Sequence, residues 1–207
     1  MSPVQSSSIA VGMRERILDS ADVLARRFGP AKMTIADIAR DLAMSPANVY
    51  KHFSSKSEIL EAIGIRKTAV VLKEIELVVA MDSSIWDRIE KIVMRLDHFL
   101  DRQSLAPDAA TDAEFIVGLI DVEVARFTNK WRFIEDFRAS IKEAFVRLIR
   151  QGMQAGEISA GNCEETGAAI FDCFTHAFEP LLIAQRERSE RIFAYQRQIR
   201  FLSRVSR

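Results

Sequence analysis

Apolar residues recur every three or four positions along nearly the whole chain, and no segment shows the sustained two-residue alternation of a half-buried strand. One such segment carries Ile17, Leu18, Ala21, Leu24, Ala25 and Phe28. Only 8 Gly and 5 Pro interrupt the 207 residues, and Gly29 with Pro30 stands where this first segment stops. The spacing predicts an all-α protein of about nine helices.

Two short helices are predicted directly after the first one, from Thr34 to about Leu42 and from Ser45 onward. Thr34 and Asp37 form a variant of the capping box, with Asp in place of Glu. Ser45 is an N-cap residue, and Pro46 follows at the first helical position, where its missing N–H does no harm. A turn of three or four residues joins the two helices, which is the spacing of a helix-turn-helix.

Six longer helices are predicted after this pair, at about 55–80, 84–103, 110–127, 130–152, 162–186 and 189–205. Full capping boxes are expected at the start of the first, from Ser55 with Glu58, and of the fifth, from Asn162 with Glu165. Pro180 predicts a kink inside the fifth helix.

The chain divides into a basic N-terminal part and an acidic remainder. Residues 1–56 hold 8 Lys and Arg against 5 Asp and Glu, a net charge of +3, and residues 57–207 balance this with −3. Residues 1–12 are rich in Ser and carry no charged side chain. We expect a disordered tail over 1–12, a three-helix head with the helix-turn-helix over 13–58, and a helical body over 59–207.

The second short helix has side chains suited to DNA. Its first turn contains Ser45, Ala47 and Asn48, and it would lead into the major groove. Asn48 can pair with adenine, whereas Tyr50 and other polar residues nearby can reach phosphates. The candidate DNA-contacting residues are Thr34, Ser45, Ala47, Asn48, Tyr50, Lys51, His52 and Lys56. An ordinary pair of surface helices is the alternative, because tight helical pairs have other uses.

Residues 14–60 resemble the DNA-binding head of the TetR family of transcriptional regulators. The resemblance lies in RERILDSADVLARRFG and in MTIADIARDLAMSPANVYKHFSSKSEIL. Two positions depart from the family pattern. Ala43 stands in the turn where the family usually has Gly, and Ala47 with Asn48 stands where it often has Gly-Thr. The departure at Ala43 concerns the geometry of the turn. The departure at Ala47 and Asn48 suggests a different operator sequence.

The resemblance implies a ligand-responsive regulator, more often a repressor than an activator, that binds a palindromic DNA operator as a homodimer. It implies a four-helix bundle between protomers, made by the last two long helices of each chain. Candidate interface residues there are Phe178, Leu181, Leu182, Phe193, Tyr195 and Phe201. The alternative is that these faces form only an intrachain core. The tail from Arg186 has 7 Arg and 2 Glu and is interpreted as a solvated helix face, with the binding of an acidic partner as the alternative.

The resemblance also implies a small-molecule effector pocket in the body, whose aromatic content favours an apolar or aromatic effector. Candidate pocket residues are Trp86, Phe99, Phe115, Trp131, Phe137, Phe171, Phe174 and His176. Ordinary core packing is the competing interpretation, because large apolar residues at helical spacing are usually core.

Other classes of protein have little support in the sequence. The chain contains no H-E-x-x-H, G-x-S-x-G, Walker or G-x-G-x-x-G pattern, so no catalytic residue, cofactor or metal site is predicted. Cys163 and Cys173 match neither a disulfide framework nor a C-x-x-C site. No apolar run approaches the roughly 18 residues needed to span a membrane, and the expected location is the cytoplasm. An all-helical ligand carrier is the remaining alternative, and DNA binding would distinguish it.

Overall fold

The structure is a computed structural model, and it describes residues 3–100, 132–177 and 186–206. These residues form eight α-helices and one short 3-10 segment, with no strand among them. The prediction of an all-α protein is confirmed. The helix expected over 110–127 lies outside the described residues.

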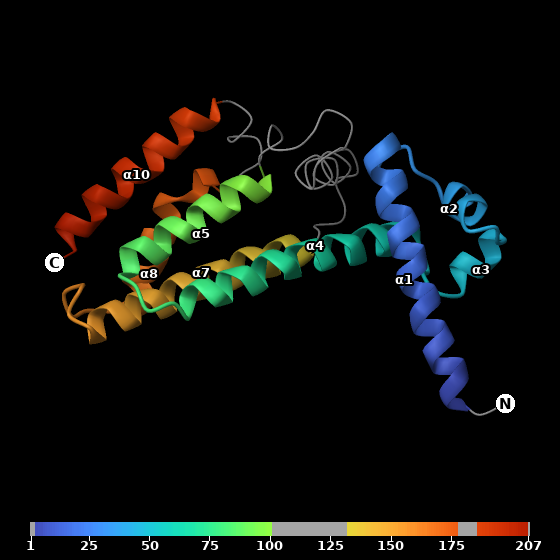
Figure 1. Cartoon of the computed structure of the whole chain (residues 1–207), viewed down its shortest axis with the longest axis horizontal. Coiled ribbons are helices and arrows are strands. Elements are labelled where there is room, and N and C mark those ends of the chain that lie inside the picture. The colour runs from blue at the N-terminus through green and yellow to red at the C-terminus, as the bar shows by residue number, and fades with distance from the viewer. Residues whose placement is uncertain (1–2, 101–131, 178–185, 207) are drawn as a thin grey trace. The chain divides into compact units, whose positions relative to one another are not determined.

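Residues 3–67 form the first of two compact units. It contains α1 (Pro3–Phe28), α2 (Ile35–Asp41), α3 (Pro46–Tyr50) and the first part of α4 (Lys56–Val79) (Figure 1). Its fully buried core joins all four helices, with the side chains of Ile17, Ala21, Met33, Ile38, Val49, Phe53, Ile59 and Ile63. The helical periodicity predicted the inward side of α1 except at Phe28, which is 45% exposed.

The start of α1 differs from the expectation of a disordered tail over 1–12. In the structure α1 begins at Pro3, so residues 3–12 continue the helix of the head. Proline is compatible with the first turn of a helix, and no second proline follows until Pro30. The helix ends at Phe28, where Gly29 has φ 83° and donates its N–H to the carbonyl of Ala25 at 2.9 Å.

The second unit contains the described residues from Thr68 onward. It holds the remainder of α4 with α5 (Ile85–Leu100), α7 (Arg132–Gln154), α8 (Cys163–Cys173), the 3-10 segment η1 (Thr175–Ala177) and α10 (Arg188–Val205). Within this unit α7 packs against α8, and α5 packs against α7, η1 and α10. The division falls inside α4, beyond the boundary at residue 58 that the sequence suggested.

The close packing of α7 on α8 depends on one glycine. A Cβ atom at Gly167 would lie 2.7 Å from the Cα of Val146, which is closer than side chains approach a backbone. The absence of a side chain at Gly167 therefore lets the two helix backbones meet.

The fifth predicted helix, over 162–186, is shorter in the structure. Asn162 caps α8 as expected, and its side chain accepts hydrogen bonds from the N–H groups of Glu164 and Glu165 at 3.0 and 3.3 Å. The helix ends at Cys173, where Phe174 leaves the helical conformation and the chain continues as η1. The hydroxyl of Thr175 donates to the carbonyl of Asp172 at 2.8 Å, which satisfies one of the orphan carbonyls of the last turn. The kink expected at Pro180 lies outside the described residues.

A buried polar cluster fixes α10 on α5. The carboxylate of Asp97, 1% exposed, accepts two hydrogen bonds from the guanidinium of Arg191, at 2.7 and 3.2 Å. The hydroxyl of Tyr195 donates to the same carboxylate at 3.0 Å, and Arg191 also donates to the carbonyl of Arg186. Burial and the nearby Asp97 carboxylate raise the pKa of Tyr195. The cluster sets the rotation of α10 about its own axis, because Arg191 and Tyr195 both face inward.

Candidate nucleic-acid interface

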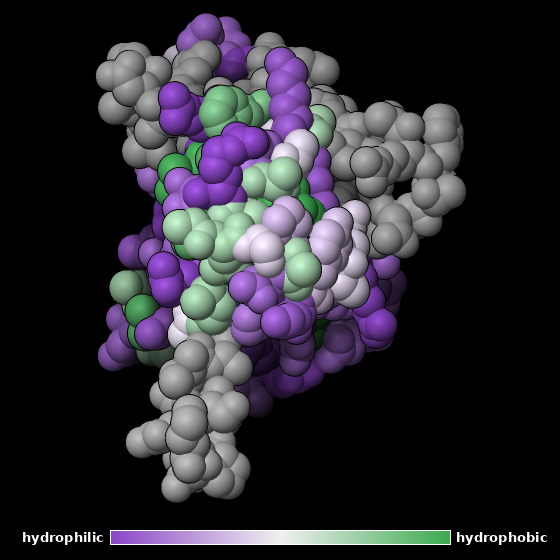
Figure 2. Space-filling model, turned by 90° about the vertical axis from the view of Figure 1, so that its right-hand side faces the viewer, coloured by the Kyte–Doolittle hydropathy of each residue, from purple (hydrophilic) through white to green (hydrophobic). Residues whose placement is uncertain are grey.

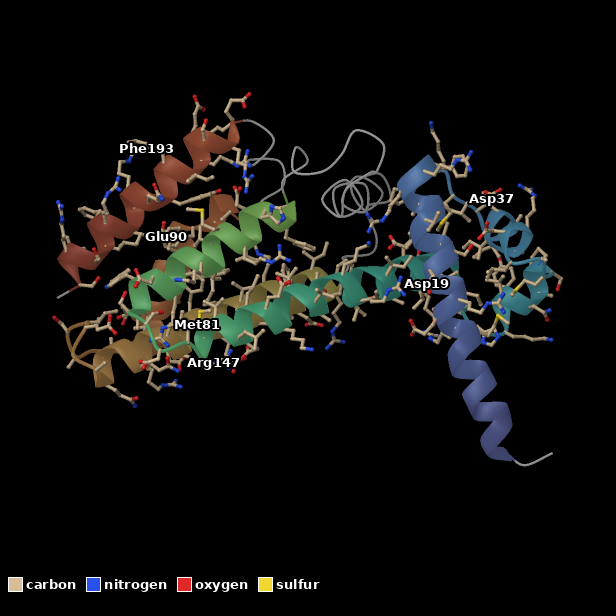
Figure 3. The ribbon with its side chains drawn as sticks, in the orientation of Figure 1. Asp19, Asp37, Met81, Glu90, Arg147 and Phe193 are labelled. Carbon is tan, nitrogen blue, oxygen red and sulfur yellow. The ribbon has the colours of Figure 1, made fainter. Side chains whose placement is uncertain are left out.

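The first helix of the pair, α2, begins as the sequence predicts. The Thr34 hydroxyl accepts a hydrogen bond from the N–H of Asp37 at 3.2 Å, and the Asp37 carboxylate accepts from the N–H of Thr34 at 3.1 Å. The Thr34 hydroxyl also donates to that carboxylate at 2.6 Å, and this bond is the main reason that the pKa of Asp37 lies below its usual range. The predicted variant of the capping box is confirmed. Asp37 is labelled on α2 in Figure 3.

The turn between α2 and α3 is a Schellman motif. The N–H of Met44 donates to the carbonyl of Ala39 at 2.9 Å, and the N–H of Ala43 donates to the carbonyl of Arg40 at 3.2 Å. Ala43 occupies the left-handed position of this motif, with φ 52°, and it is the one non-glycine residue with positive φ among the described residues. The turn thus keeps the geometry that glycine favours, although a Cβ atom makes that geometry costly.

The second helix, α3, divides cleanly into a buried and an exposed side. Ser45 is its N-cap, and its hydroxyl oxygen accepts from the N–H of Asn48 at 3.3 Å. Val49 and Phe53 are buried against the other helices of the head. The exposed residues in and around α3 are Ser45, Pro46, Ala47, Asn48, Tyr50 and Lys51. Figure 2 views the side on which α2 and α3 lie in Figure 1 and shows hydrophilic and hydrophobic residues mixed there.

Two of the candidate DNA-contacting side chains hold each other in place. The Lys51 ammonium donates to the side-chain oxygen of Asn48 at 3.0 Å, one turn apart on the exposed side of α3. This leaves the NH₂ group of Asn48 facing outward as a donor. His52 and Lys56 are half-buried, and the ammonium of Lys56 donates to the carbonyl of Ala31 at 2.7 Å. Lys56 therefore also ties the start of α4 to the loop after α1.

Arg14 on α1 was not among the predicted site residues, yet it holds the end of α3. Its guanidinium lies 3.9 Å from the centre of the Phe53 ring and donates to the carbonyl of His52. It also pairs with Glu58 at 3.2 Å. No local pattern indicates this role, because the contact joins residues 38 apart and an arginine on a helix is usually solvated.

Glu58 links Arg14 to the turn between α3 and α4. Its carboxylate accepts from the N–H of Ser54 at 2.7 Å and from the Ser54 hydroxyl at 2.8 Å. These bonds, with the ion pair to Arg14, lower the pKa of Glu58. The expected capping box paired Glu58 with Ser55. Ser55 does accept from the N–H of Glu58, but the carboxylate reaches one residue further back, because Ser54 offers two donors.

A charge cluster holds α1 against α4 within the first unit. Arg66 lies 2.6 Å from Asp19 and 3.4 Å from Glu15, and the buried Lys67 lies 2.9 Å from Asp22. Asp19 is labelled in Figure 3, on the part of α1 that α4 passes. The acidic residues of α1 and the basic residues of α4 thus pair with each other, and α3 provides the exposed polar face.

The described candidate pocket residues of the body include two groups of aromatic rings in contact. Phe171 and Phe174 are buried around Phe145, with ring centres 5.7 and 6.2 Å from it. Phe99 and Phe137 form a separate tilted pair at 6.0 Å.

Trp86 belongs to neither group of rings. It stands in the first turn of α5, about 20 Å along the helix from Phe99. There it lines an open groove of about 860 Å³ with Met153 and Ile158. Phe115, Trp131 and the side chain of His176 lie outside the described parts of the chain.

The candidate interface residues on α10 fall on opposite sides of that helix. Phe193 and Phe201 are 59% and 63% exposed. Tyr195 is 2% exposed and binds Asp97, so it belongs to the interior of the protomer and cannot offer surface to another chain. The error arose because aromatic residues two positions apart were assigned to one face, whereas on a helix they point in nearly opposite directions. Phe178, Leu181 and Leu182 lie outside the described residues.

Among the described residues, no group of three His, Cys, Asp or Glu side chains could hold a metal ion. None of the helices that the structure describes is both long enough and apolar enough to cross a membrane.

A tight pair of short helices with an exposed polar second helix, in an otherwise all-helical chain, is the arrangement found in helix-turn-helix transcription regulators. The family model described as bacterial regulatory proteins of the tetR family matches residues 17–63. A second model, described as the tetracyclin repressor-like C-terminal domain, matches residues 95–194. The chain belongs to the TetR family of transcriptional regulators.

Solved structures have the same fold at low sequence identity. A putative TetR-family regulator from Mesorhizobium loti MAFF303099 is 15% identical with a TM-score of 0.68, over 95% of this chain and 97% of that one. A putative regulator from Saccharomonospora viridis, in complex with choline, is 18% identical with a TM-score of 0.66, over 93% and 96%. RolR in complex with resorcinol is 14% identical with a TM-score of 0.61, over 94% and 89%. None of the curated proteins compared with the chain matches it in sequence.

Proposed function

We propose that this TetR-family regulator is a repressor that binds a palindromic operator as a homodimer and is released by a small apolar or aromatic effector. The observation that carries the DNA-binding part is the exposed side of α3, where Ala47 and Asn48 stand in the first turn of the helix and Lys51 stands at its C-cap. Ala47 is small enough for close approach to the groove and can meet a thymine methyl group, and the free NH₂ of Asn48 can donate to a base edge.

Two recognition helices explain a palindromic operator. One five-residue helix offers too few side chains to select a site among a genome of competitors. In a dimer, two copies of α3 about 34 Å apart would meet successive major grooves of a two-fold symmetric sequence. A dimer that covers an operator also excludes polymerase without any activating surface, and it acts in the cytoplasm, where the DNA of a bacterial cell lies.

The buried rings of the body support an apolar or aromatic effector. Phe99 and Phe137 are 8% and 9% exposed, so they lie at the margin of the packed interior and not at its centre. A ligand at this margin would contact ring faces and edges without disrupting the fully buried Phe145 and Phe174. Relatives of this fold that are bound to choline and to resorcinol indicate that such bodies accept small molecules.

The helix α4 is the natural element for transmitting effector binding, because its residues belong to both compact units. Effector would favour the form whose recognition helices are wrongly spaced for DNA, and DNA would favour the other form. Glycine substitutions at exposed positions of α4, such as Lys73 and Ala69, would loosen the helix. If effector still released DNA from such a variant, α4 would not be the connection.

The decisive experiment is recovery of bound fragments from sheared genomic DNA of the source organism, followed by sequencing. We expect a few sites that share an inverted repeat, and the neighbouring genes would indicate the chemistry of the effector. A variant with Asn48 and Lys51 both replaced by Ala is the matched control, because it leaves the buried Val49 in place. Recovery of no preferred sequence at low salt, from a protein confirmed to be dimeric, would reject the regulator and favour a ligand carrier.

A further inference from the structure

The groove beside Trp86 takes no part in the proposed function. It is an open hollow of about 860 Å³, and its walls come from the start of α5, the end of α7, the turn after α7 and the end of α10. Figure 1 shows these four segments together, at the left of the picture. Phe99 and Phe137 do not line it, so it is separate from the effector position proposed above.

Backbone hydrogen bonds hold the walls of this groove in place. The N–H of Glu157 donates to the carbonyl of Gly152 at 2.8 Å, across a turn in which Gly156 has φ 74°. The N–H of Ser159 donates to the carbonyl of Ser206 at 2.8 Å, which ties this turn to the end of α10. The hollow is therefore formed by the fold itself and needs no ligand to create it.

The apolar part of the lining consists of one large ring and two flexible or branched side chains. Trp86 comes from the first turn of α5, Met153 from the last turn of α7, and Ile158 from the turn that follows. Ile158 is 4% exposed and belongs to the core, whereas Trp86 and Met153 are half-buried and keep surface for a ligand. An indole ring attracts cations more strongly than other aromatic side chains do, and a thioether adapts to varied shapes.

The charge of the lining is that of a single carboxylate. Among the described residues that line the groove, Glu157 has the one charged side chain, and Ser84, Ser159 and Ser203 add hydroxyl groups. The Oε2 atom of Glu157 accepts a hydrogen bond from the N–H of Ile85 at 3.0 Å. Its Oε1 atom makes no hydrogen bond within the described part of the chain. The carboxylate therefore keeps one oxygen for a ligand.

The helix ends around the groove also favour positive charge. Met153 and Ser203 stand in the last turns of α7 and α10, where the partial charge of a helix is negative. The helix that begins at the groove is α5, and its first N–H group is already bound by Glu157. Arg200 and Arg204 stand near Ser203 on α10 but do not line the groove.

We propose that this groove is a second small-molecule site, which binds an organic cation: an amine or quaternary ammonium group that carries an apolar substituent. The cationic group would lie between the Trp86 indole and the Glu157 carboxylate, and the substituent would lie against Met153. A neutral aromatic molecule would leave the carboxylate without a partner, and an anion would be repelled by it. The inference depends neither on DNA binding nor on the proposed effector.

Benzyltrimethylammonium, a quaternary ammonium ion with one aromatic ring, is the probe for this site. Calorimetric titration of the full chain should show one saturable site per chain, with at least about tenfold higher affinity than for benzyl alcohol and no binding of benzoate. Equal affinity for benzyl alcohol would overturn the choice of a cation. Absence of any binding up to about 10 mM of the cation would overturn the site.

Two substitutions place the probe in the groove. Glu157→Gln removes the charge but keeps an acceptor for the N–H of Ile85, and Trp86→Leu removes the ring. Each should weaken binding of the cation about tenfold. Asp87→Asn is the matched control, because it removes an acidic charge next to Trp86 at a position outside the groove, and it should bind as wild type does. An equal loss in Asp87→Asn would mean that net charge, and not the groove, attracts the ion.

Tryptophan fluorescence gives a second measurement that does not depend on the stability of those variants. The chain has 2 Trp, so Trp131→Phe leaves Trp86 as the one tryptophan. Its emission should change on addition of benzyltrimethylammonium and saturate with the affinity that calorimetry gives. Unchanged emission with undiminished binding would overturn the inference. Loss of binding in Phe99→Leu, with Trp86→Leu unaffected, would instead assign the ion to the effector position.

Discussion

The guanidinium of Arg14 lies 3.9 Å from the centre of the Phe53 ring and donates to the carbonyl of His52, so one residue of α1 fixes the end of the recognition helix. Arg14→Ala removes a cation–π contact and a charged hydrogen bond, together worth about 1–3 kcal/mol. We expect faster amide hydrogen exchange over 46–53 and weaker binding to all DNA.

The matched control for Arg14 is Arg16→Ala, which removes an exposed arginine from the same helix. The control loses the same formal charge, so an equal loss of DNA affinity in both variants would mean that Arg14 acts through charge alone. Exchange rates over 46–53 should change only in Arg14→Ala.

Glu58 should make the head sensitive to acid. Its carboxylate has a pKa below its ordinary value of 4.5, mainly because it accepts from the Ser54 N–H. A group with a lowered pKa stabilises the folded state above its unfolded pKa, and this stabilisation is lost as the pH falls through the folded pKa. Glu58→Gln should therefore be less stable than wild type at pH 7, and the difference should shrink below about pH 4.5.

Denaturant unfolding at a series of pH values checks the role of Glu58. Ser54→Ala removes the hydroxyl donor to Glu58 but keeps the backbone N–H donor. This variant should therefore still lose most of the stability that wild type loses at low pH. A difference between wild type and Glu58→Gln that stayed constant from pH 7 to pH 3 would contradict the assignment.

Ala43 occupies a backbone conformation that glycine adopts without cost. A left-handed conformation costs a non-glycine residue roughly 1–2 kcal/mol, and the greater unfolded-state entropy of glycine offsets about half of this. Ala43→Gly should therefore stabilise the protein by about 0.5–1 kcal/mol. Thermal unfolding at fixed protein concentration would measure it.

The same substitution at Ala36 is the control for Ala43. Ala36 is exposed within α2, where replacement by glycine should destabilise by about 1 kcal/mol. Opposite signs at the two positions are the expected result. Destabilisation at both would mean that the turn does not hold Ala43 in the left-handed region.

Gly167 allows α8 to pack directly on α7. A methyl group there would lie 2.7 Å from the Cα of Val146 and 3.1 Å from its backbone nitrogen, so the helices would have to separate. Gly167→Ala should destabilise the body by about 1–3 kcal/mol, despite the better helix propensity of alanine. Gly161→Ala is the control, since the nearest atom to its Cβ would be the Met153 Cε at 3.7 Å. Equal melting temperatures for the two variants would contradict close packing at Gly167.

Local signals in the sequence predicted the helices well. The caps at Thr34, Ser45 and Asn162 depend on residues within one turn, and all three stand where the pattern placed them. The early end of α8 was missed, because apolar spacing continues past Cys173 and carries no information on where a 3-10 turn replaces the helix.

Contacts between distant segments were not predictable from the pattern. Arg14 meets His52, and Asp97 meets Arg191, across 38 and 94 residues. A charged residue on a helix looks the same in sequence whether it is solvated or buried against a partner. Tyr195 is a different case, because helix geometry alone places it nearly opposite Phe193, and the position of Asp97 then determines which of these two sides faces inward.

Asn48 and Lys56 should affect DNA binding in different ways. Asn48 lies exposed in the first turn of α3, with its oxygen held by Lys51 at 3.0 Å and its NH₂ directed outward, so it is suited to a base edge. Asn48→Ala should change the preferred operator, at a cost of about 1–3 kcal/mol for the original site, with little effect on non-specific DNA. Lys56→Ala should weaken binding to all DNA sequences about equally and reduce the slope of log affinity against log salt by about one.

Selection from a random DNA pool, with titrations at several salt concentrations, would separate these effects. An unchanged operator preference in Asn48→Ala would assign base reading to another residue of α3. An unchanged salt slope in Lys56→Ala would mean that the bond from its ammonium to the Ala31 carbonyl is its main role.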